Sequence, residues 1–451
     1  MNNALPYRQL LHTGNPLFNI SFILMALALV LLPFTTWFMW PIGVLLIILW
    51  AAQGNWRGKW ADFKANDGIP YGLFLLGICL IPIFGLFYSD NMNLAWHQVE
   101  CYLWFLIAPL VILTTSRNLL TKNHIHFLLG LFSASAFVHI LVLFAHGIFL
   151  FFKTGDSTYL YYSTFSFLRH PTYVAMYTTF AYLIILVYLI DNHDIIKIWR
   201  KIFLYLAEAV MLIGVFCLYS RAGIITLVAV HIPIAIYAVH KRKAEWKWML
   251  LVFIVIAVLF TLLMTTNFMP INRFKEPKYT LEKENKPTKT SDVRLILWQL
   301  SWKAAVENLP FGTGTGDCYD AIREKYCEHA YFQDPNLITN ARNKYLHEML
   351  INHDYNAHNQ YLQVLLTNGI PGIILLLLYN FVPLGESIRR RDILLLSLFI
   401  LLTLNNCFEC VFYRRFGVDF IAIMIPLLMM RTEKPFVRED KIQSSLPPDA
   451  E

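Results

Sequence analysis

Three side chains that lie far apart in the sequence have the chemistry to handle a phosphorylated substrate. They are Arg221, Arg294 and His358. A guanidinium group binds phosphate oxygens through a planar pair of N–H donors. An unperturbed imidazole titrates near neutrality, so it can accept a proton from an attacking hydroxyl. These residue types predict an anion-binding site with a general base, provided that the fold brings them to one place.

Arg221 follows Ser220 in the segment Tyr219-Ser220-Arg221-Ala222-Gly223, between two apolar runs. Ser220 is suited to cap the helix that starts here, and a helix N-terminus presents free N–H groups and a positive dipole. Together with the guanidinium, these features favour a phosphate site. The alternative is an interfacial arginine that pairs with lipid headgroups.

Arg294 lies in a polar segment, residues 267–357, in which Asp292–Asn308 is predicted to form a helix that Pro310 stops. Arg294 is about 200° from Asp292 around that helix, on its apolar side. A guanidinium directed away from water needs an anionic partner. Because the helix also carries tryptophans, we expect it to lie on the membrane surface. Snorkelling to lipid phosphate, or a structural salt bridge, is the alternative for Arg294.

His358 opens the next apolar run and is followed by Asn359, Gln360 and Tyr361, which we expect to orient the imidazole or a substrate. A lone histidine at a helix start is usually structural, so the functional interpretation depends on the two arginines. Further along the run, the segment 368–371, Asn-Gly-Ile-Pro, predicts a broken helix, which membranes tolerate mainly beside protein or a wet cavity.

Glu409 is the fourth candidate, at the end of a later apolar run. Its carboxylate has the chemistry to hydrogen-bond a sugar or to position a cation. An ion pair with the nearby Arg414 or Arg415 is the alternative that the sequence favours.

The composition predicts that a helical membrane protein positions these side chains. The chain is 57% hydrophobic and 15% charged, and its apolar runs are long enough to cross a hydrocarbon core of about 30 Å. The first run is followed almost directly by a second, so we expect a retained helix and not a cleaved signal. About twelve spans are expected, at residues 17–33, 35–52, 71–88, 99–115, 125–151, 171–190, 202–219, 222–239, 248–266, 359–384, 393–408 and 416–431.

Lysine and arginine decide the expected orientation. If the N-terminus is cytoplasmic, most of these residues fall in short inner segments, among them residues 197–201 and 389–391. The expected organisation is therefore membrane helices over 1–266, an outer loop over 267–357, membrane helices over 358–434 and a cytoplasmic tail over 435–451. The net charge of +7 then reflects membrane topology, and it does not indicate nucleic-acid binding.

The cysteines and glycines of the outer loop add little chemistry. Cys318 and Cys327 both fall in the loop, where a disulfide is permitted. The three glycines in residues 311–317, Phe-Gly-Thr-Gly-Thr-Gly-Asp, match neither a P-loop nor a dinucleotide fingerprint, and they predict a turn that lets backbone approach closely. Cys407 and Cys410 form a CxxC without a second ligand pair, which favours helix packing over metal binding.

These segments resemble the O-antigen ligase/polymerase superfamily. The similar features are Ser-Arg-Ala-Gly at residues 220–223, Arg-Leu-Ile-Leu-Trp at 294–298 ahead of the Gly-Thr-Gly run, and His-Asn-Gln-Tyr-Leu at 358–362 ahead of Asn-Gly-Ile-Pro-Gly. In the first half of the chain, His-Pro-Thr-Tyr at 170–173 and residues 100–109 also look similar. Each motif is short, and the signal comes from their order around a large outer loop.

The resemblance implies an all-α polytopic enzyme with a GT-C-like fold in the bacterial inner membrane. Such an enzyme transfers a glycan from undecaprenyl pyrophosphate at the periplasmic face, inverts the anomeric centre and needs no metal or other cofactor. The two essential arginines of the family match Arg221 and Arg294, and its essential histidine matches His358. An acidic residue that some members need falls, more loosely, at Glu409.

An O-antigen ligase, whose acceptor is the lipid A core, is the leading expectation. An O-antigen polymerase and a protein oligosaccharyltransferase of the same superfamily are the alternatives with the same donor. A lipid-linked sugar transporter is the alternative from another class, and it would keep ionisable groups near the middle of the membrane. His139, Glu208 and His231 are the few candidates there, and we expect the histidines to be packed or hydrogen-bonded, with Glu208 as a partner for His231.

Overall fold

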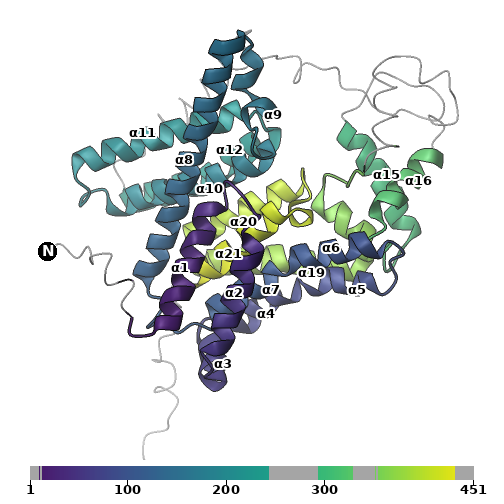
Figure 1. The fold of residues 1–451 in the computed structure, drawn as a ribbon, viewed down its shortest axis with the longest axis horizontal. Helices are drawn as coiled ribbons and strands as arrows, with labels where there is room; N and C mark the ends of the chain where they lie inside the picture. Colours follow the sequence, from purple (N-terminus) through teal and green to yellow (C-terminus); the bar gives the residue numbers. More distant parts are fainter. Residues whose placement is uncertain (1–9, 11–12, 243–292, 329–350, 352–353, 432–451) are drawn as a thin grey trace, which may run out of the picture.

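The computed structural model of the chain describes residue 10 and residues 13–242, 293–328, 351 and 354–431 (Figure 1). Every regular element in those ranges is helical, which confirms the expected all-α class. In chain order the elements are α1 Pro16–Leu31, α2 Met39–Ala52, α3 Trp56–Ala65, η2 Gly68–Gly72, α4 Leu73–Gly77, α5 Leu80–Leu86, α6 Met92–Tyr102, α7 Trp104–Leu113, α8 Lys122–Thr154, η3 Ser157–Leu160, α9 Tyr162–Phe165, α10 Pro171–Asn192, α11 Ile198–Cys217, α12 Arg221–Arg242, α15 Val293–Glu307, α16 Cys318–Glu328, α19 Gln360–Arg389, α20 Ile393–Asn406, η5 Val411–Tyr413 and α21 Arg415–Arg431.

The expectation of about twelve spans is confirmed only in part. Among the described residues, 5 helices are long and apolar enough to cross a membrane, or 6 if the bent pair α2 and α3 counts as one span. Several expected spans form shorter apolar helices, because the backbone breaks inside runs that look continuous in the sequence. The expected span 71–88, for example, is divided between α4 and α5. The expected span 248–266 and the tail 435–451 lie outside the described residues.

The core of the bundle is formed around α10 and α21. Both helices are buried on nearly all sides, as expected for helices that are hydrophobic all round. Phe420 of α21 packs against Phe132 of α8 and against Tyr177 and Phe180 of α10. α20 and α21 therefore lie in the middle of the molecule (Figure 1).

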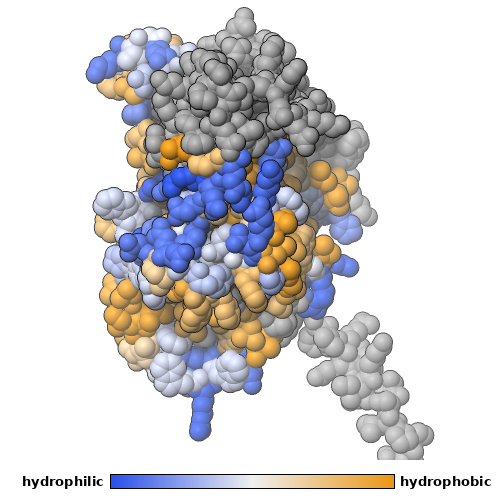
Figure 2. Space-filling view, turned by 90° about the vertical axis from the view of Figure 1, so that its right-hand side faces the viewer, coloured by the Kyte–Doolittle hydropathy of each residue, from blue (hydrophilic) through white to orange (hydrophobic). Residues whose placement is uncertain are grey.

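A second, smaller core lies under α15 and α16. Its members are Leu297, Leu300, Ala304, Ala305, Cys318, Ile322, Tyr326, Ala357, Leu366, Cys410 and Tyr413. The predicted helix at 292–308 is confirmed, but α16 and α19 cover most of the apolar side that was expected to rest on the membrane, while Leu295 and Trp302 stay exposed. On the face that carries α15 and α16, hydrophilic side chains form a band above a hydrophobic surface (Figure 2).

The glycine-rich loop after α15 binds to a break in α19, so the predicted break and the predicted close approach are both confirmed. Gly369 has φ 59° and ψ −149° within α19. The N–H of Ile370 donates to the Pro310 carbonyl at 2.8 Å, and the N–H of Thr313 donates to the Leu366 carbonyl at 2.8 Å. A Cβ on Gly369 would lie 2.0 Å from the Pro310 oxygen. The loop thereby fixes α15 relative to the first part of α19.

The disulfide permitted by the sequence is excluded by α16. Cys318 and Cys327 lie near opposite ends of this one helix, roughly 13 Å apart along its axis at 1.5 Å per residue. A disulfide needs Cα atoms within about 7 Å. Both thiols are free, and the Cys318 sulfur lies 2.9 Å from the Tyr413 hydroxyl.

Candidate functional site

His358 and Glu409 form the centre of the candidate site. The Nδ1 atom of His358 lies 3.0 Å from the Oε1 atom of Glu409. The Glu409 side chain is only 5% exposed, whereas the His358 side chain is 26% exposed. The carboxylate is therefore buried behind an imidazole that solvent or a substrate can reach.

Arg294 lies on the other carboxylate oxygen. Its Nη2 atom is 3.9 Å from Oε2 of Glu409, and its side chain is 28% exposed. The distance is short enough for an ion pair but too long for a hydrogen bond. The buried Oε2 atom accepts no hydrogen bond from any described residue. Arg294 thus has an anionic partner, and this partner is a protein carboxylate, as in the salt bridge that the sequence left open as the alternative.

The charge of Glu409 decides which nitrogen of His358 is basic. Burial raises the pKa of the Glu409 carboxyl, but the hydrogen bond and charge of His358, with the charges of His170 and Arg294, outweigh it and lower the pKa below its ordinary value. An ionised carboxylate only accepts hydrogen bonds, so Nδ1 of His358 must donate. This assigns the lone pair to Nε2, the atom that a general base would use.

The backbone around His358 holds the imidazole in place. His358 has φ 45°, in the left-handed region that few residues other than glycine adopt. Its N–H donates to the Asn356 side chain at 3.0 Å, and Asn359 caps α19 by accepting from the Tyr361 and Leu362 N–H groups. Such strain is typical of functional positions. The orienting group for the ring is thus Glu409, and not Asn359 or Tyr361 as the sequence suggested.

Two buried glutamines of α19 join the segments that carry His358 and Glu409. The Oε1 atom of Gln360 accepts from the Phe412 N–H at 2.8 Å. The Oε1 atom of Gln363 accepts from the Ala357 N–H at 2.9 Å. Both side chains are fully buried. They hold the chain just before His358 and just after Glu409 against the same helix.

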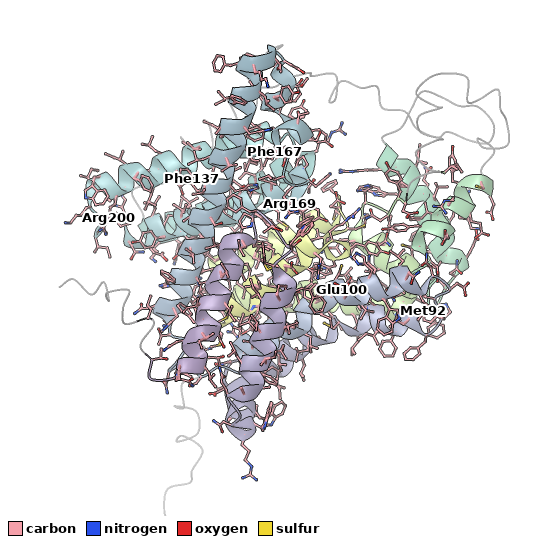
Figure 3. The ribbon with its side chains drawn as sticks, viewed as in Figure 1. Met92, Glu100, Phe137, Phe167, Arg169 and Arg200 are labelled. Atoms are coloured by element: carbon pink, nitrogen blue, oxygen red, sulfur yellow. The ribbon has the colours of Figure 1, made fainter. Side chains whose placement is uncertain are left out.

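The favoured alternative for Glu409, an ion pair with Arg414 or Arg415, is wrong among the described contacts. Arg415 pairs with Glu100 of α6 at 3.1 Å, and Arg414 has no carboxylate within ion-pair distance in the described part of the chain. Glu100 and Arg169 both lie beside the central helices, whereas Arg200 lies at the far end of α11 (Figure 3).

His170 and Arg414 belong to this site, although sequence reasoning did not select them. His170 is exposed, and its pKa is lowered because the surrounding protein desolvates it, with the Glu409 charge opposing and the His358, Arg294 and Arg414 charges adding to this effect. The available signal was the His-Pro-Thr-Tyr similarity at 170–173. Nothing in the sequence shows that this segment lies beside residues more than a hundred positions away.

Arg221 lies in a neighbouring part of the same end of the bundle. It is the first residue of α12 and is exposed. The predicted cap is confirmed, since the Gly223 N–H donates to the Ser220 hydroxyl at 3.2 Å. The Ser220 hydroxyl lies 3.3 Å from that of Thr172, in the first turn of α10. The start of α12 is thus joined to the start of α10, which His170 precedes.

Helix starts supply most of these side chains. His170 directly precedes α10, Arg221 begins α12, Arg414 directly precedes α21, and His358 lies just before the cap of α19. Arg294 lies in the first described turn of α15. A helix N-terminus carries partial positive charge and free N–H groups. These helix starts therefore bring partial positive charge to the same end of the bundle as the arginines.

The two histidines within the bundle are hydrogen-bonded or packed as expected, but Glu208 is not the partner of His231. The Nε2 atom of His231 lies 2.9 Å from the Tyr182 hydroxyl and its Nδ1 atom 2.6 Å from the Leu227 carbonyl, so Glu208 is not its hydrogen-bond partner. His139 is buried against Phe34. Within the described ranges no group of three or more His, Cys, Asp or Glu side chains is placed to hold a metal ion.

The fold is that of a multi-pass helical membrane protein, and it places a histidine and an arginine on one buried carboxylate. Residues 206–377 match the family model described as O-antigen ligase. That segment includes Arg221, Arg294 and His358, while Glu409 follows it. The match supports membership of the chain in the O-antigen ligase superfamily, whose members are glycosyltransferase-like ligases and polymerases. No curated protein matches the chain.

Proposed function

We propose that this chain is an O-antigen ligase that transfers a glycan from undecaprenyl pyrophosphate to a hydroxyl of the lipid A core. The observation that carries the proposal is the contact of His358 with Glu409 beside Arg294. It places a candidate base and a phosphate-binding group on one carboxylate, in a chain that matches the O-antigen ligase model. The proposed location is the periplasmic face of the bacterial inner membrane, as the distribution of basic residues predicts.

The His358 imidazole is the proposed general base. Its Nε2 atom takes the proton of the acceptor hydroxyl as the oxygen attacks the anomeric carbon of the glycan. The bond from that carbon to the pyrophosphate oxygen breaks on the opposite side, so the configuration inverts. Glu409 stabilises the imidazolium that forms, as a carboxylate does in a catalytic triad. A positioned base contributes on the order of 10²–10⁴-fold to such a step.

The arginines are the proposed ligands of the pyrophosphate. Negative charge grows on the leaving group as the bond breaks, and cations fixed in place beforehand stabilise it by several kcal/mol. Arg294 and Arg221 supply guanidinium groups, and Arg414 with the start of α10 extends the positive surface.

No metal or other cofactor takes part in the proposed mechanism. Pyrophosphate is a good leaving group when cations neutralise it, and the arginines can do this without a divalent ion. Treatment of the purified protein with a chelator tests this point. Unchanged transfer supports the metal-free mechanism, and a loss that a divalent cation restores contradicts it.

Transfer by the purified chain in detergent tests the assigned function. The donor is a defined glycan on undecaprenyl pyrophosphate, offered with lipid A core, with a second lipid-linked glycan or with a peptide. We expect glycan on the lipid A core. Extension of the lipid-linked glycan would identify a polymerase instead, and a modified peptide an oligosaccharyltransferase. Absence of transfer to every acceptor, combined with movement of the donor across vesicles, would favour transport.

The arginines are tested in the same assay. Arg294→Lys and Arg221→Lys keep the charge but lose the bidentate fork. We expect each variant to raise the KM for the donor and to lower kcat. Together these changes should lower kcat/KM roughly 10-fold or more, because the loss of one charged contact costs over about 1.4 kcal/mol. Arg200→Lys, at the far end of α11, is the matched control. Equal activity of all three variants would remove the arginines from the donor site.

A further inference from the structure

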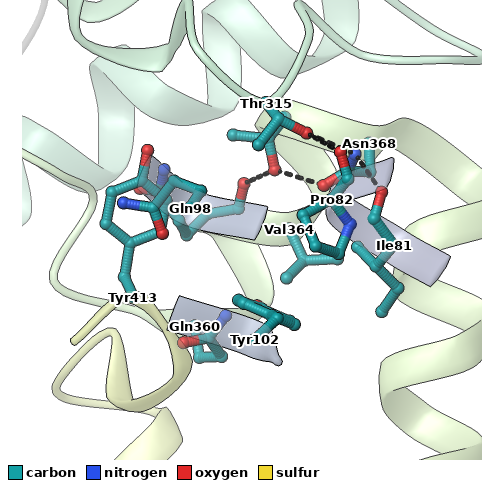
Figure 4. A pocket seen from close by; sticks show the side chains of 11 residues that line it. Ile81, Pro82, Gln98, Tyr102, Thr315, Gln360, Val364, Asn368 and Tyr413 are labelled. Carbon is teal, nitrogen blue, oxygen red and sulfur yellow. Dashed lines mark hydrogen bonds between the residues drawn. The ribbon is translucent and has the colours of Figure 1, made fainter. Parts of the chain in front are cut away.

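A small buried pocket lies behind the candidate site, between α5, α6, α19 and η5. Its lining includes Gln98 and Tyr102 of α6, Gln360 and Gln363 of α19, and Thr315 of the glycine-rich loop (Figure 4). Its volume is about 10 Å³, which is close to the roughly 10–15 Å³ that one water molecule requires.

Three buried amide atoms at this pocket have no hydrogen-bond partner among the described residues. They are Oε1 of Gln98, Nε2 of Gln360, which lies beside the Tyr102 hydroxyl, and Nε2 of Gln363, which lies beside the Cys318 sulfur. All three side chains are at most 3% exposed. A buried polar group without a partner is costly, so such groups are normally satisfied by protein or by an ordered water.

The amide oxygen and nitrogen of Gln360 and Gln363 cannot be exchanged by a flip of the side-chain amide. The Oε1 atom of Gln360 already accepts from the Phe412 N–H, and that of Gln363 accepts from the Ala357 N–H. A backbone N–H needs an acceptor, so each Nε2 must stay on the side away from the main chain. The pocket is thus lined by two N–H donors and one oxygen acceptor.

We propose that one ordered water molecule binds in this pocket and holds the His358–Glu409 pair in register. The water accepts from Gln360 Nε2 and Gln363 Nε2 and donates to Gln98 Oε1, which gives it the three hydrogen bonds typical of a buried water. The two glutamines carry the chain beside His358 and Glu409, so the water fixes both segments relative to α6. The catalytic consequence rests on the proposed function, whereas the water site itself does not.

The same pocket also includes the glycine-rich loop. The Thr315 hydroxyl donates to the Pro82 carbonyl at 2.9 Å, and the Asn368 amide donates to the Ile81 carbonyl at 2.9 Å (Figure 4). The loop that positions α15, and with it Arg294, therefore closes one wall of the water site. The water site therefore contacts the segments that position His358, Glu409 and Arg294.

A density map of the purified full chain that resolves ordered waters tests the site without any assay of activity. We expect a peak within hydrogen-bond distance of Gln98 Oε1, Gln360 Nε2 and Gln363 Nε2 in the wild type. In Gln98→Met, which removes the acceptor at similar volume, we expect the peak to be lost. A map in which Gln360 donates directly to the Tyr102 hydroxyl, with no peak in the pocket, would overturn the proposal.

A double-mutant cycle tests the positioning role. Gln98→Met should lower kcat roughly fivefold, the equivalent of one lost hydrogen bond, with the donor KM unchanged. In a Glu409→Gln background, where His358 is already misoriented, the same substitution should have little further effect. Gln53→Met, at the end of α2, is the control and should change neither value.

The outcomes separate the two proposals. The double variant could instead lose a further fivefold in kcat beyond the loss caused by Glu409→Gln alone. That result would show that the water acts only on general stability and would overturn its positioning role. Wild-type kcat in Gln98→Met would do the same. If the peak is present but the purified chain transfers no glycan at all, the proposed function fails while the water site stands.

Discussion

The two ends of α19 each hold a buried carboxylate against guanidinium groups, and the two arrangements differ. At the C-terminal end, Arg390 contacts Asp67 and Glu386 at 2.6 Å each, and its side chain is fully buried. At the N-terminal end, Arg294 contacts Glu409 at 3.9 Å with its side chain partly exposed. We call Arg390 with Asp67 and Glu386 the tight cluster, and Arg294 with Glu409 and His358 the loose cluster.

The difference separates structural charges from charges available to a ligand. Short contacts to two carboxylates use the guanidinium of Arg390 within the protein, where its removal would leave buried charge uncompensated. Around Glu409 the ion pair with Arg294 is long, Oε2 accepts no hydrogen bond among the described residues, and the imidazole of His358 is accessible to a substrate. We therefore expect substitutions at one end to change stability and those at the other to change turnover.

Removal of His358 should have the largest effect on activity. His358→Ala deletes the proposed base, so transfer should fall on the order of 10²–10⁴-fold, while binding of the lipid-linked donor persists. Turnover and donor binding of the purified variant are the measurements. His193→Ala, near the end of α10, is the control. Near-normal transfer by His358→Ala would end the assignment of the base.

Substitution at the tight cluster should affect stability instead. Arg390→Met removes the buried cation that Asp67 and Glu386 share, which we expect to cost about 3–5 kcal/mol of unfolding free energy. The transfer rate per folded molecule should stay near that of the wild type. Thermal unfolding in detergent and turnover normalised to folded protein measure the two effects. A large loss of turnover at unchanged stability would break the comparison.

The break in α19 lies between the two clusters and offers a matched pair of glycines. Gly369→Ala places a Cβ 2.0 Å from the Pro310 oxygen at a positive φ, so the glycine-rich loop must move. We expect lower transfer and a loss of roughly 1–3 kcal/mol of stability, the cost of such backbone strain. Gly385→Ala, in the same helix, meets no atom within 4 Å and should be neutral. Equal behaviour of both variants would contradict the docking of the loop.

The effect of Glu409 on stability should be the smallest of these, and it should fade in acid. Its folded pKa lies below the ordinary value of 4.5, so its stabilising contribution is complete above pH 4.5 and is lost as the pH falls through the folded pKa. The stability difference between wild type and Glu409→Gln should be constant from neutral pH to about pH 5 and shrink below it. A difference that grows on acidification would contradict the direction of this shift.

The sequence predicts the parts of the site better than their assembly. The capped start of α12, the helix around Arg294 and the break at Gly369 follow from local rules, because caps, helical periodicity and Gly-Pro segments act over a few residues. The contact of Glu409 with His358 does not follow from local rules, because the two residues are far apart in the sequence. Arg414 and Arg415 are its neighbours in sequence, but the buried glutamines of α19 turn it toward His358.

The number of spans and the position of α15 were predicted less well for related reasons. Hydropathy detects an apolar run but not a division within it, as between α4 and α5. An apolar helix face can pack on lipid or on protein, and only the fold shows that α16 and α19 cover that of α15. Both errors concern what lies next to a segment and not what the segment is.

The most direct test of the account compares Glu409→Gln with Glu386→Gln. These side chains are almost equally buried, at 5% and 4% exposed, and lie in the loose and the tight cluster. In single-turnover transfer by the purified chain, we predict a loss of about 10²-fold or more for Glu409→Gln with unfolding little changed at neutral pH. Glu386→Gln should unfold at lower temperature and keep its rate. Equal rates for the two variants would contradict a catalytic role for the His358–Glu409 pair.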